Sequence, residues 1–275
     1  RHELSAELEI LVVDDASTDG SAEGSEGAGA RLVRHDRNLG YGASLKSGIR
    51  AARHGTIVII DADGTYPVEA IGPILQDLES ADMVVGDRSG AMQHVPWLRR
   101  PAKWFLRRLA RFVTGTPIPD LNSGLRAFRR SLVQQYLPVI SDRFSFTTTL
   151  TIASLCDGLS VCYVPIDYRR RVGRSKMGAW DFFGFVSLVA RLSVLFRPLK
   201  VFVPLALACF LLGGAKLVWD IVSAAEQRGA GKLLTEATVS TTTVILLVVA
   251  VQMLLMGMMA ESQVRRSGRG GGEYV

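Results

Sequence analysis

The architecture of this chain can be worked out from one segment, Ile57-Val58-Ile59-Ile60-Asp61-Ala62-Asp63-Gly64-Thr65-Tyr66-Pro67. Its four consecutive β-branched apolar residues predict a strand that is buried on both faces, as strands of parallel sheets are. The strand leads directly into two carboxylates, and the glycine and proline that follow force a turn. Because residues i and i+2 of an extended segment point the same way, we expect Asp61 and Asp63 to converge just beyond the strand.

Two acids at the end of a strand can bind a metal ion, or they can simply stabilise the turn. In open α/β sheets ligands bind at the carboxyl ends of the strands, and two hard oxygen ligands there suit Mg²⁺ or Mn²⁺ holding phosphate oxygens. The alternative is ordinary turn chemistry, with Asp63 capping the next helix. The Asp-x-Asp pattern alone leaves both open, so the neighbouring segments decide between them.

The preceding segment repeats the arrangement of a strand followed by acids. A strand over residues 8–13 ends in Asp14 and Asp15, and a helix N-cap accounts for only one of the acids in this turn. After another strand, over residues 31–35, the glycines of Asn38-Leu39-Gly40-Tyr41-Gly42 allow close backbone approach. The helix that opens there directs its N-terminus at the ligand edge.

The following segments complete the fold class. A helix is expected over residues 68–80, and a strand over 82–86 ends in Asp87-Arg88. Strand, helix and strand at this spacing indicate right-handed crossovers. The sequence therefore predicts an α/β domain with a mainly parallel sheet and acids collected along one edge.

The helix predicted over residues 97–112 combines basic and apolar chemistry. At helical spacing it carries Arg100, Lys103, Arg107 and Arg111, together with Trp97, Trp104, Phe105, Leu109 and Phe112. One interpretation is a solvated basic face over a stripe packed in the core. The other is a helix lying on an anionic membrane surface, with tryptophan at the level of the headgroups.

Two further polar segments are candidate parts of a site. The turn-rich cluster over residues 119–126 contains Asp120, a reserve candidate for a general base that could equally be a turn-former. A helix over residues 144–155 and a strand over 160–165 then lead to the strongly cationic run Tyr168-Arg169-Arg170-Arg171-Val172-Gly173-Arg174-Ser175-Lys176. Such a loop is either solvated or wraps an anion, and its attachment to a buried strand favours the anion.

The C-terminal part of the chain predicts a membrane anchor. Residues 179–196 are aromatic and nearly uncharged, which suits a helix at the bilayer interface. Residues 201–219 and 237–260 approach or exceed the roughly 20 apolar residues that span a bilayer core, and a buried core hairpin is the alternative. Cations precede the first span and follow the second. By the positive-inside rule we expect a multi-pass protein of the cell membrane with its catalytic domain in the cytosol.

Composition limits the partners. A chain of 275 residues can form one large domain and an appendage, and its net charge of +6 indicates a partner that carries phosphates or an anionic membrane face. The basic residues adjoin the spans rather than forming a separate groove, which disfavours nucleic acid. The three cysteines lack metal-ligand spacing, so reduced thiols are expected.

Together these segments resemble the family-2 glycosyltransferases, and among them the polyprenyl-phosphate sugar synthases related to dolichyl-phosphate mannose synthase. The matching motifs are Val12-Val13-Asp14-Asp15-Ala16-Ser17-Thr18-Asp19-Gly20, Asn38-Leu39-Gly40-Tyr41-Gly42, Asp61-Ala62-Asp63-Gly64 and Arg171-Val172-Gly173-Arg174-Ser175-Lys176. The resemblance implies a glycosyltransferase-A type, Rossmann-like domain over residues 1–178 and an interfacial helix over 179–198. It also implies two transmembrane helices over 199–260 and a basic cytosolic tail over 261–275.

The resemblance further implies roles for individual residues. Asp14, Asp15 and Gly40 would help seat the nucleoside of a UDP- or GDP-linked sugar. Asp61 and Asp63 would hold Mg²⁺ or Mn²⁺ on its diphosphate. The residues that would address the donor or acceptor phosphates are Arg88, Arg126, Arg171, Ser175 and Lys176.

The chain departs from the family pattern in three places. Relatives begin with one more strand, whose Pro-x-Tyr-Asn-Glu-like turn contacts the nucleobase; here either that strand lies upstream of Arg1 or the chain binds donor poorly. The helix near Thr147-Thr148-Thr149 often carries a glutamate in relatives, so no base is assigned there. The missing Gln-x-x-Arg-Trp signature argues against a processive polysaccharide synthase.

The expected reaction is a single displacement that inverts the anomeric carbon of the sugar. A polyprenyl (undecaprenyl or dolichyl) phosphate would attack at the cytosolic membrane face, and such a phosphate is anionic at neutral pH because its second pKa is about 6. It needs orienting cations and a metal at the leaving group more than a general base. The alternatives are transfer to another membrane lipid hydroxyl, which would need Asp120, and an inactive nucleotide-sugar-binding scaffold. A homo-oligomer is left open.

Overall fold

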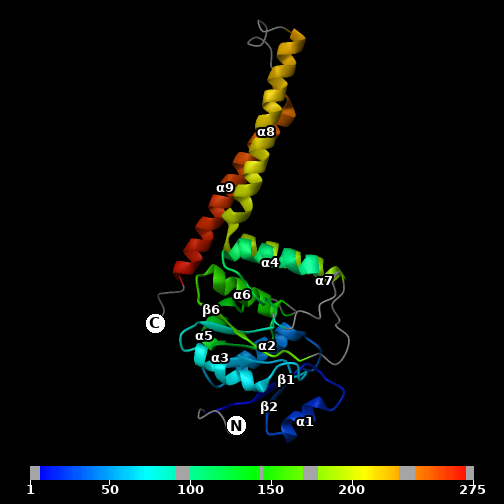
Figure 1. The fold of residues 1–275 in the computed structure, drawn as a ribbon, viewed down its shortest axis with the longest axis vertical. Coiled ribbons are helices and arrows are strands. Elements are labelled where there is room, and N and C mark those ends of the chain that lie inside the picture. The colour runs from blue at the N-terminus through cyan, green and yellow to red at the C-terminus, as the bar shows by residue number, and fades with distance from the viewer. Residues whose placement is uncertain are drawn as a thin grey trace. The chain divides into compact units, whose positions relative to one another are not determined.

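The chain divides into two compact units, Arg1–Val189 and Ala190–Val275. The computed structural model describes residues 7–88, 90, 100–140, 142, 145–169, 179–228 and 239–270. Within these ranges every strand lies in unit 1, whereas unit 2 is made of long apolar helices (Figure 1).

Unit 1 is built on two sheets. Its strands are β1 (Leu11–Asp14), β2 (Arg31–Arg34), β3 (Thr56–Ile59), β4 (Met83–Asp87), β5 (Arg126–Arg129) and β6 (Val161–Pro165). β1 and β2 pair in parallel, and the other four form a sheet in the order β3-β5-β4-β6. β5 is antiparallel to β3 and β4, whereas β4 and β6 are parallel. Three strands of the larger sheet therefore share one direction, and the predicted α/β class with a mainly parallel sheet is confirmed.

β5 is the strand that the sequence pattern did not indicate. It has an arginine at each end and follows a turn-rich cluster. Tertiary context overrides this pattern, because Arg126, Ala127 and Phe128 are fully buried where β5 lies between β3 and β4.

The register of β5 brings distant segments together. Arg126, its first residue, pairs with Ile59 at the end of β3 and with Val85 near the end of β4. The loop before β5 therefore lies at the edge of the sheet where β3 and β4 deliver Asp61 and Arg88. This edge is the one at which ligands of open α/β sheets bind.

The helices of unit 1 follow the predicted order with two differences. They are α1 (Ser21–Gly27), α2 (Tyr41–Ala51), α3 (Ile71–Asp77), α4 (Arg100–Thr114), α5 (Arg130–Tyr136), α6 (Phe146–Cys156) and α7 (Ala179–Phe196), the last ending in unit 2. α5 was not predicted. The helix expected over 68–80 is divided into a 3-10 turn, Val68–Ala70, and α3. Pro73 explains the division, since it has no N–H to donate to Glu69 and is tolerated only in a first helical turn.

α6 is the central helix of unit 1. All its residues except Leu155 are buried, and it contacts both β6 and α4. Figure 1 shows it between the sheet and α4. A second layer forms where α3 packs on β4, β5 and β6, with Ile74 and Leu78 in a common cluster with Val84.

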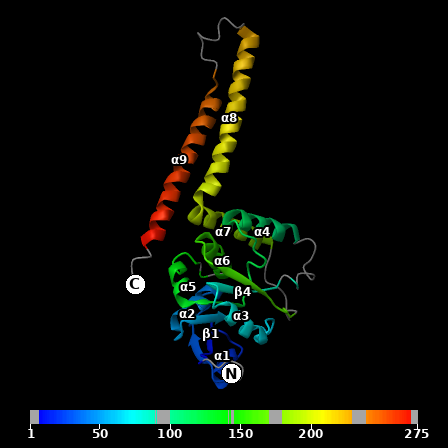
Figure 2. The ribbon, with the colours of Figure 1, turned by 60° about the vertical axis from the view of Figure 1, so that its left-hand side comes forward.

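Unit 2 consists mainly of α8 (Pro198–Arg228) and α9 (Thr241–Gly270), which lie side by side along their length (Figure 2). Both helices are long and apolar enough to cross a membrane, and the spans found in them cover Pro198–Ala225 and Thr241–Val264. Most of each apolar window is exposed in the protein itself. This exposure is typical of helices that face lipid rather than a soluble core. The two helices expected over 201–219 and 237–260 are confirmed as α8 and α9.

Close packing and one polar cluster join α8 to α9. A side chain at Gly213 would meet Leu247, and one at Gly257 would meet Phe202, so both glycines let the helices approach. Asp220 of α8 accepts hydrogen bonds from the backbone N–H of Ser240 and the hydroxyl of Thr243.

Candidate active site

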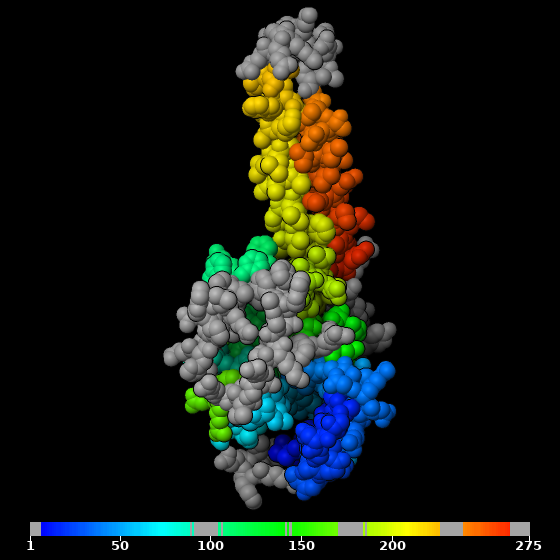
Figure 3. Space-filling view, turned by 90° about the vertical axis from the view of Figure 1, so that its right-hand side faces the viewer, coloured from blue at the N-terminus to red at the C-terminus, as the bar shows by residue number. Residues whose placement is uncertain are grey.

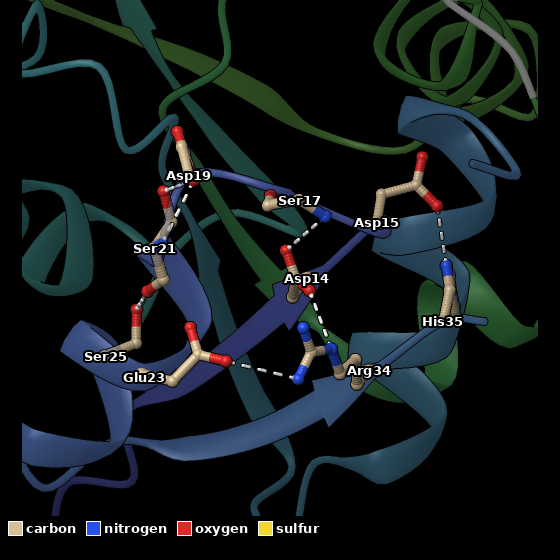
Figure 4. Close-up of polar contacts among 9 residues, drawn as sticks. All are labelled: Asp14, Asp15, Ser17, Asp19, Ser21, Glu23, Ser25, Arg34 and His35. Carbon is tan, nitrogen blue, oxygen red and sulfur yellow. Dashed lines mark hydrogen bonds and ion pairs between the residues drawn. The ribbon is translucent and has the colours of Figure 1, made fainter. Parts of the chain in front are cut away.

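Asp14 and Asp15, the two acids at the end of β1, point in opposite directions (Figure 4). Such alternation is usual along a strand. Asp14 is buried, and its Oδ1 accepts a hydrogen bond from the N–H of Ser17 at 3.1 Å. Its Oδ2 lies 3.4 Å from Nε of Arg34 on β2. Asp14 therefore ties the turn after β1 to β2.

Asp15 fastens the glycine-rich motif to β1. Its Oδ1 accepts the N–H of Leu39 at 2.9 Å, and its Oδ2 accepts the N–H of Gly40 at 2.8 Å. Burial acts to raise the pKa of the Asp15 carboxyl, but these two N–H groups and His35 outweigh it and hold that pKa below its usual value. Gly40 has a φ of 103°, a conformation that favours glycine. The motif is thus held in place at the N-terminus of α2.

Asp15, His35 and Ser47 are joined in the order of a Ser-His-Asp triad. His35 places Nδ1 2.8 Å from Oδ1 of Asp15 and Nε2 2.9 Å from Oγ of Ser47. A nucleophilic serine also needs N–H donors aimed at an oxyanion. Ser47 lies inside α2, where N–H groups donate along the helix. We therefore interpret the three residues as a structural tie between β1, β2 and α2.

Asp61 is held between two other segments. Its Oδ1 accepts a hydrogen bond at 3.0 Å from the hydroxyl of Tyr41, the first residue of α2. On another side it approaches the backbone of Gly124 so closely that a Cβ at position 124 would collide with its carboxylate. The orientation of this acid is therefore set by α2 and by the loop before β5.

Asp63 lies two residues further, on the exposed part of the turn. Its Oδ1 accepts the N–H of Thr65 at 3.1 Å and the hydroxyl of Thr65 at 2.5 Å. Gly64 has a φ of 71°, which the tight turn requires. Thr65 is buried and shapes the turn that carries Asp63.

The donor set fits a divalent cation that also binds phosphate. The described residues contain no group of three or more His, Cys, Asp or Glu side chains placed to hold a metal. Asp61 and Asp63 would thus contribute two carboxylates, and substrate oxygens and water would complete the shell. Mg²⁺ is usually bound in this way, by one or two carboxylates plus substrate phosphates.

Arg88 and Asp120 form a bidentate ion pair at the same edge. Nε of Arg88 donates to Oδ2 of Asp120 at 2.7 Å, and an Nη donates to Oδ1 at 2.9 Å. The guanidinium carbon lies 5.9 Å and 5.2 Å from the ring centroids of Tyr66 and Tyr168, whose rings meet edge to face. Asp120 and the two tyrosines together hold the guanidinium in one orientation.

The pair changes the expectation for Asp120. Burial acts to raise the pKa of this carboxyl, and the hydrogen bonds and charge of Arg88 outweigh burial and lower it. A base whose lone pairs are occupied and whose pKa is lowered is poorly suited to accept a proton near neutral pH. The geometry therefore argues against the reserve assignment of Asp120 as a general base.

Arg126, expected from the sequence to address a phosphate, has surroundings that argue against this role. It is fully buried, and its N–H groups donate to the carbonyl oxygens of Ser123 and Thr147 and to the hydroxyl of Thr151. Its side chain instead joins the start of β5 to α6. Burial lowers its pKa.

The chain after β6 returns to the acidic turn. The N–H of Arg169 donates to the carbonyl oxygen of Thr65 at 2.9 Å. The start of the cationic run therefore lies against the turn that carries Asp63. The other predicted members of this run, Arg171, Ser175 and Lys176, lie outside the described residues.

Sequence reasoning missed three contributors to this edge: Tyr41, Tyr66 and Gly124. Tyr41 and Tyr66 lie inside the recognised motifs, but roles were assigned only to the glycines and acids beside them. Gly124 carried no local signal, because its importance comes from its approach to Asp61, distant in sequence.

Comparison with known families and proteins gives an independent result. The glycosyl transferase family 2 profile matches residues 3–137, and the GtrB C-terminal hairpin profile matches residues 197–263. The dolichyl-phosphate hexose transferase of Haloferax volcanii is 30% identical over 169 residues, covering 61% of this chain and 73% of the relative. The polyprenol monophosphomannose synthase of Mycolicibacterium smegmatis is 31% identical over 194 residues, covering 64% and 72%.

A solved structure shares the fold of unit 1. It is glucosyl-3-phosphoglycerate synthase from Mycobacterium tuberculosis in complex with Mn²⁺, uridine-diphosphate-glucose and phosphoglyceric acid. The two chains have a TM-score of 0.53 and are 23% identical, with 67% of this chain and 68% of that chain covered. At this identity the likeness bears on the fold, and it agrees with a glycosyltransferase-A type domain.

Proposed function

The chain belongs to glycosyl transferase family 2, and from that premise we propose that it transfers a sugar from a nucleotide sugar to a polyprenyl phosphate at a membrane surface. The relatives named above are a dolichyl-phosphate hexose transferase and a polyprenol monophosphomannose synthase. The observation that carries the proposal is the hydrogen bond from Arg169 to Thr65. It joins the start of the cationic run, which is suited to a lipid phosphate, to the acidic turn, which is suited to a metal diphosphate.

On the donor side, Asp14, Asp15 and Gly40 would seat the nucleoside. Asp61 and Asp63 would hold the Mg²⁺ or Mn²⁺ that neutralises charge on the departing diphosphate. The exposed turn and the two points at which Asp61 is fixed support this assignment.

On the acceptor side, the phosphate needs a fixed cation. Asp120 raises the pKa of Arg88 despite burial, so the guanidinium stays charged, and the two tyrosines orient it. Arg88 would address a phosphate oxygen, with Arg171, Ser175 and Lys176 proposed for the same group. The lipid phosphate is already anionic near neutral pH, so attack on the anomeric carbon can proceed without a general base. One displacement of this kind inverts the configuration.

Membrane topology is the remaining part of the proposal. α8 and α9 would span the bilayer, since both satisfy the length and apolar character that a span requires. The cations Arg197 and Lys200 near the start of α8 and Arg265 and Arg266 near the end of α9 favour a cytosolic position for both flanks. Unit 1 would then act on cytosolic nucleotide sugars.

The test is a substrate panel with the full-length protein in membranes. UDP- and GDP-linked sugars are each combined with a polyprenyl phosphate or the matching polyprenol, and lipid products are identified by mass spectrometry. We expect glycosylation of the lipid phosphate, lost when the divalent cation is chelated. Product from the alcohol alone would favour the hydroxyl acceptor. No product with any pair, together with no metal-dependent nucleotide binding, would favour a scaffold.

A further inference from the structure

Three segments that are far apart in sequence meet at the carboxylate of Asp61. α2 contributes the hydroxyl of Tyr41, which donates to Oδ1 at 3.0 Å. The loop before β5 contributes Gly124, where a Cβ would lie within 2.8 Å of the carboxyl carbon and both oxygens of Asp61. Real Cβ atoms essentially never come that close, so a side chain at position 124 would force the Asp61 carboxylate to shift.

The backbone of Gly124, which lies against the Asp61 carboxylate, is itself held in place by a hydrogen bond. Its N–H donates to the hydroxyl oxygen of Tyr66 at 2.7 Å. Tyr66 is 4% exposed and belongs to the cluster that includes Ile74 and Val84, so it is anchored in the core. Asp61 therefore lies between a fixed backbone on one side and a hydrogen-bond donor on another.

Tyr41 is suited to be a hydrogen-bond donor to this carboxylate. A neutral phenol carries one O–H group, and the hydroxyl of Tyr41 is aimed at Oδ1 of Asp61 from the first residue of α2.

We propose that Tyr41 and Gly124 are positioning residues that fix the Asp61 carboxylate for binding a divalent cation together with a nucleoside diphosphate. This inference rests on the proposed function and assigns a second task to the Asn38-Leu39-Gly40-Tyr41-Gly42 motif. Besides bringing its backbone to the ligand edge, the motif orients the acid delivered by β3. Groups that orient metal ligands typically change metal affinity by about 10- to 100-fold when they are removed.

Two substitutions disturb the carboxylate by different routes. Tyr41→Phe removes the donor and keeps the ring, whereas Gly124→Ala adds a methyl group that pushes the carboxylate aside. Each has a matched control. Tyr136 also donates its hydroxyl to an aspartate, at 2.7 Å to Asp157, away from the site, and Tyr136→Phe removes that bond. A Cβ at Gly72 on α3 would lie in open space, so Gly72→Ala is the control for Gly124→Ala.

The experiment measures Mn²⁺ binding to the full-length protein in detergent, with UDP or GDP present. The electron paramagnetic resonance signal of free Mn²⁺ reports how much of the ion stays unbound. We expect Tyr41→Phe and Gly124→Ala to weaken Mn²⁺ binding by about tenfold or more, and the controls to match the wild type. Steady-state kinetics should show a higher Mn²⁺ concentration for half-maximal rate with an unchanged KM for lipid phosphate. Thermal unfolding of Tyr41→Phe separates this effect from misfolding.

The outcomes separate the inference from the function on which it rests. If the wild type binds Mn²⁺ in the presence of a nucleotide and the folded Tyr41→Phe protein binds it equally well, the positioning role is wrong and the metal site stands. If the wild type shows no nucleotide-dependent Mn²⁺ binding, the metal assignment of the proposed function is wrong, and the positioning role is lost with it.

Discussion

At the scale of single residues, Asp63 offers the most direct test of the metal assignment. Its side chain is exposed on the turn after β3, where Thr65 holds it by the N–H and the hydroxyl. We expect Asp63→Ala to lose roughly 3 kcal/mol or more of transition-state stabilisation, because it removes one of two metal-binding carboxylates. Initial rates at saturating donor and Mn²⁺ measure the loss. Asp77→Ala, on the exposed surface of α3, is the control, and near-wild-type transfer by Asp63→Ala would refute the assignment.

Substitution of Asp120 tests whether this carboxylate orients Arg88 or acts as a general base. Asp120→Asn leaves the partly buried guanidinium of Arg88 without its charged partner, which should destabilise the protein by about 3 kcal/mol. The folded-state pKa of Asp120 is lowered, so the pair stabilises the protein above the pKa of about 3.9 of an unfolded aspartate. This stability is lost as the pH falls through the lower folded-state pKa.

Kinetics complete the test of Asp120. If Asp120 only orients Arg88, kcat of Asp120→Asn should fall by a similar factor at each pH, so that the pH profile keeps its shape. Loss of the limb that reports a catalytic base would show that Asp120 takes the proton. Asp157→Asn, which removes an acid distant from the site, is the control.

At the scale of elements, α4 has two faces with different surroundings. Ala110 and Val113 on one face are buried within unit 1. The opposite side exposes an aromatic-basic stripe, which we define as Trp104, Phe105, Arg108, Arg111 and Phe112. In the space-filling view α4 lies at the surface of unit 1 (Figure 3). Of the two interpretations open from the sequence, this exposure favours a helix that lies on an anionic membrane.

Fluorescence can locate the stripe. In a variant that keeps Trp104 and has phenylalanine at the other three tryptophans, we expect quenching by brominated lipids in anionic nanodiscs and protection from aqueous iodide. The physical reason is that tryptophan prefers the headgroup region. A control carries its single tryptophan at Ser25 on α1, which lies far from α4 within unit 1 (Figure 1). Iodide quenching of both variants without lipid quenching of either would exclude the membrane contact.

At the scale of the whole molecule, the chain separates a catalytic unit from a helical hairpin with its own internal contacts. Asp220 accepts from the N–H of Ser240, the residue before α9, and from the hydroxyl of Thr243 in its first turn, and so links the start of α9 to α8. Lys216 pairs with the same carboxylate. Polar contacts of this kind define which turn of α8 faces the start of α9.

Removing this link should loosen the hairpin. For Asp220→Ala we expect a lower melting temperature in detergent and a broader distribution of distances between spin labels near the ends of α8 and α9. The reason is that the N–H of Ser240 and the hydroxyl of Thr243 lose their acceptor on α8. Gln252→Ala, on the exposed side of α9, is the control. An unchanged distance distribution in Asp220→Ala would show that packing at Gly213 and Gly257 alone fixes the hairpin.

The local elements of this protein follow from short-range patterns in its sequence. Unbroken apolar runs predicted β3 and the two long helices, and acids directly after strands marked the ligand edge, because these signals depend on neighbours in the chain. The cations that flank the two spans likewise predicted a cytosolic position for both flanks, because this signal is also local. Arg126 is an exception to such local signals. Its residue type predicted a phosphate ligand, whereas the surrounding residues bury its side chain.

How those elements meet depends instead on long-range packing. β5 has no strand pattern of its own and forms because β3 and β4 pair with both of its edges. Its register brings Gly124 to Asp61 and Asp120 to Arg88, contacts that span many residues of chain and leave no periodic signal. Local composition governs which segments become helices and strands. The partners of a buried side chain depend on long-range packing, which no short segment of sequence contains.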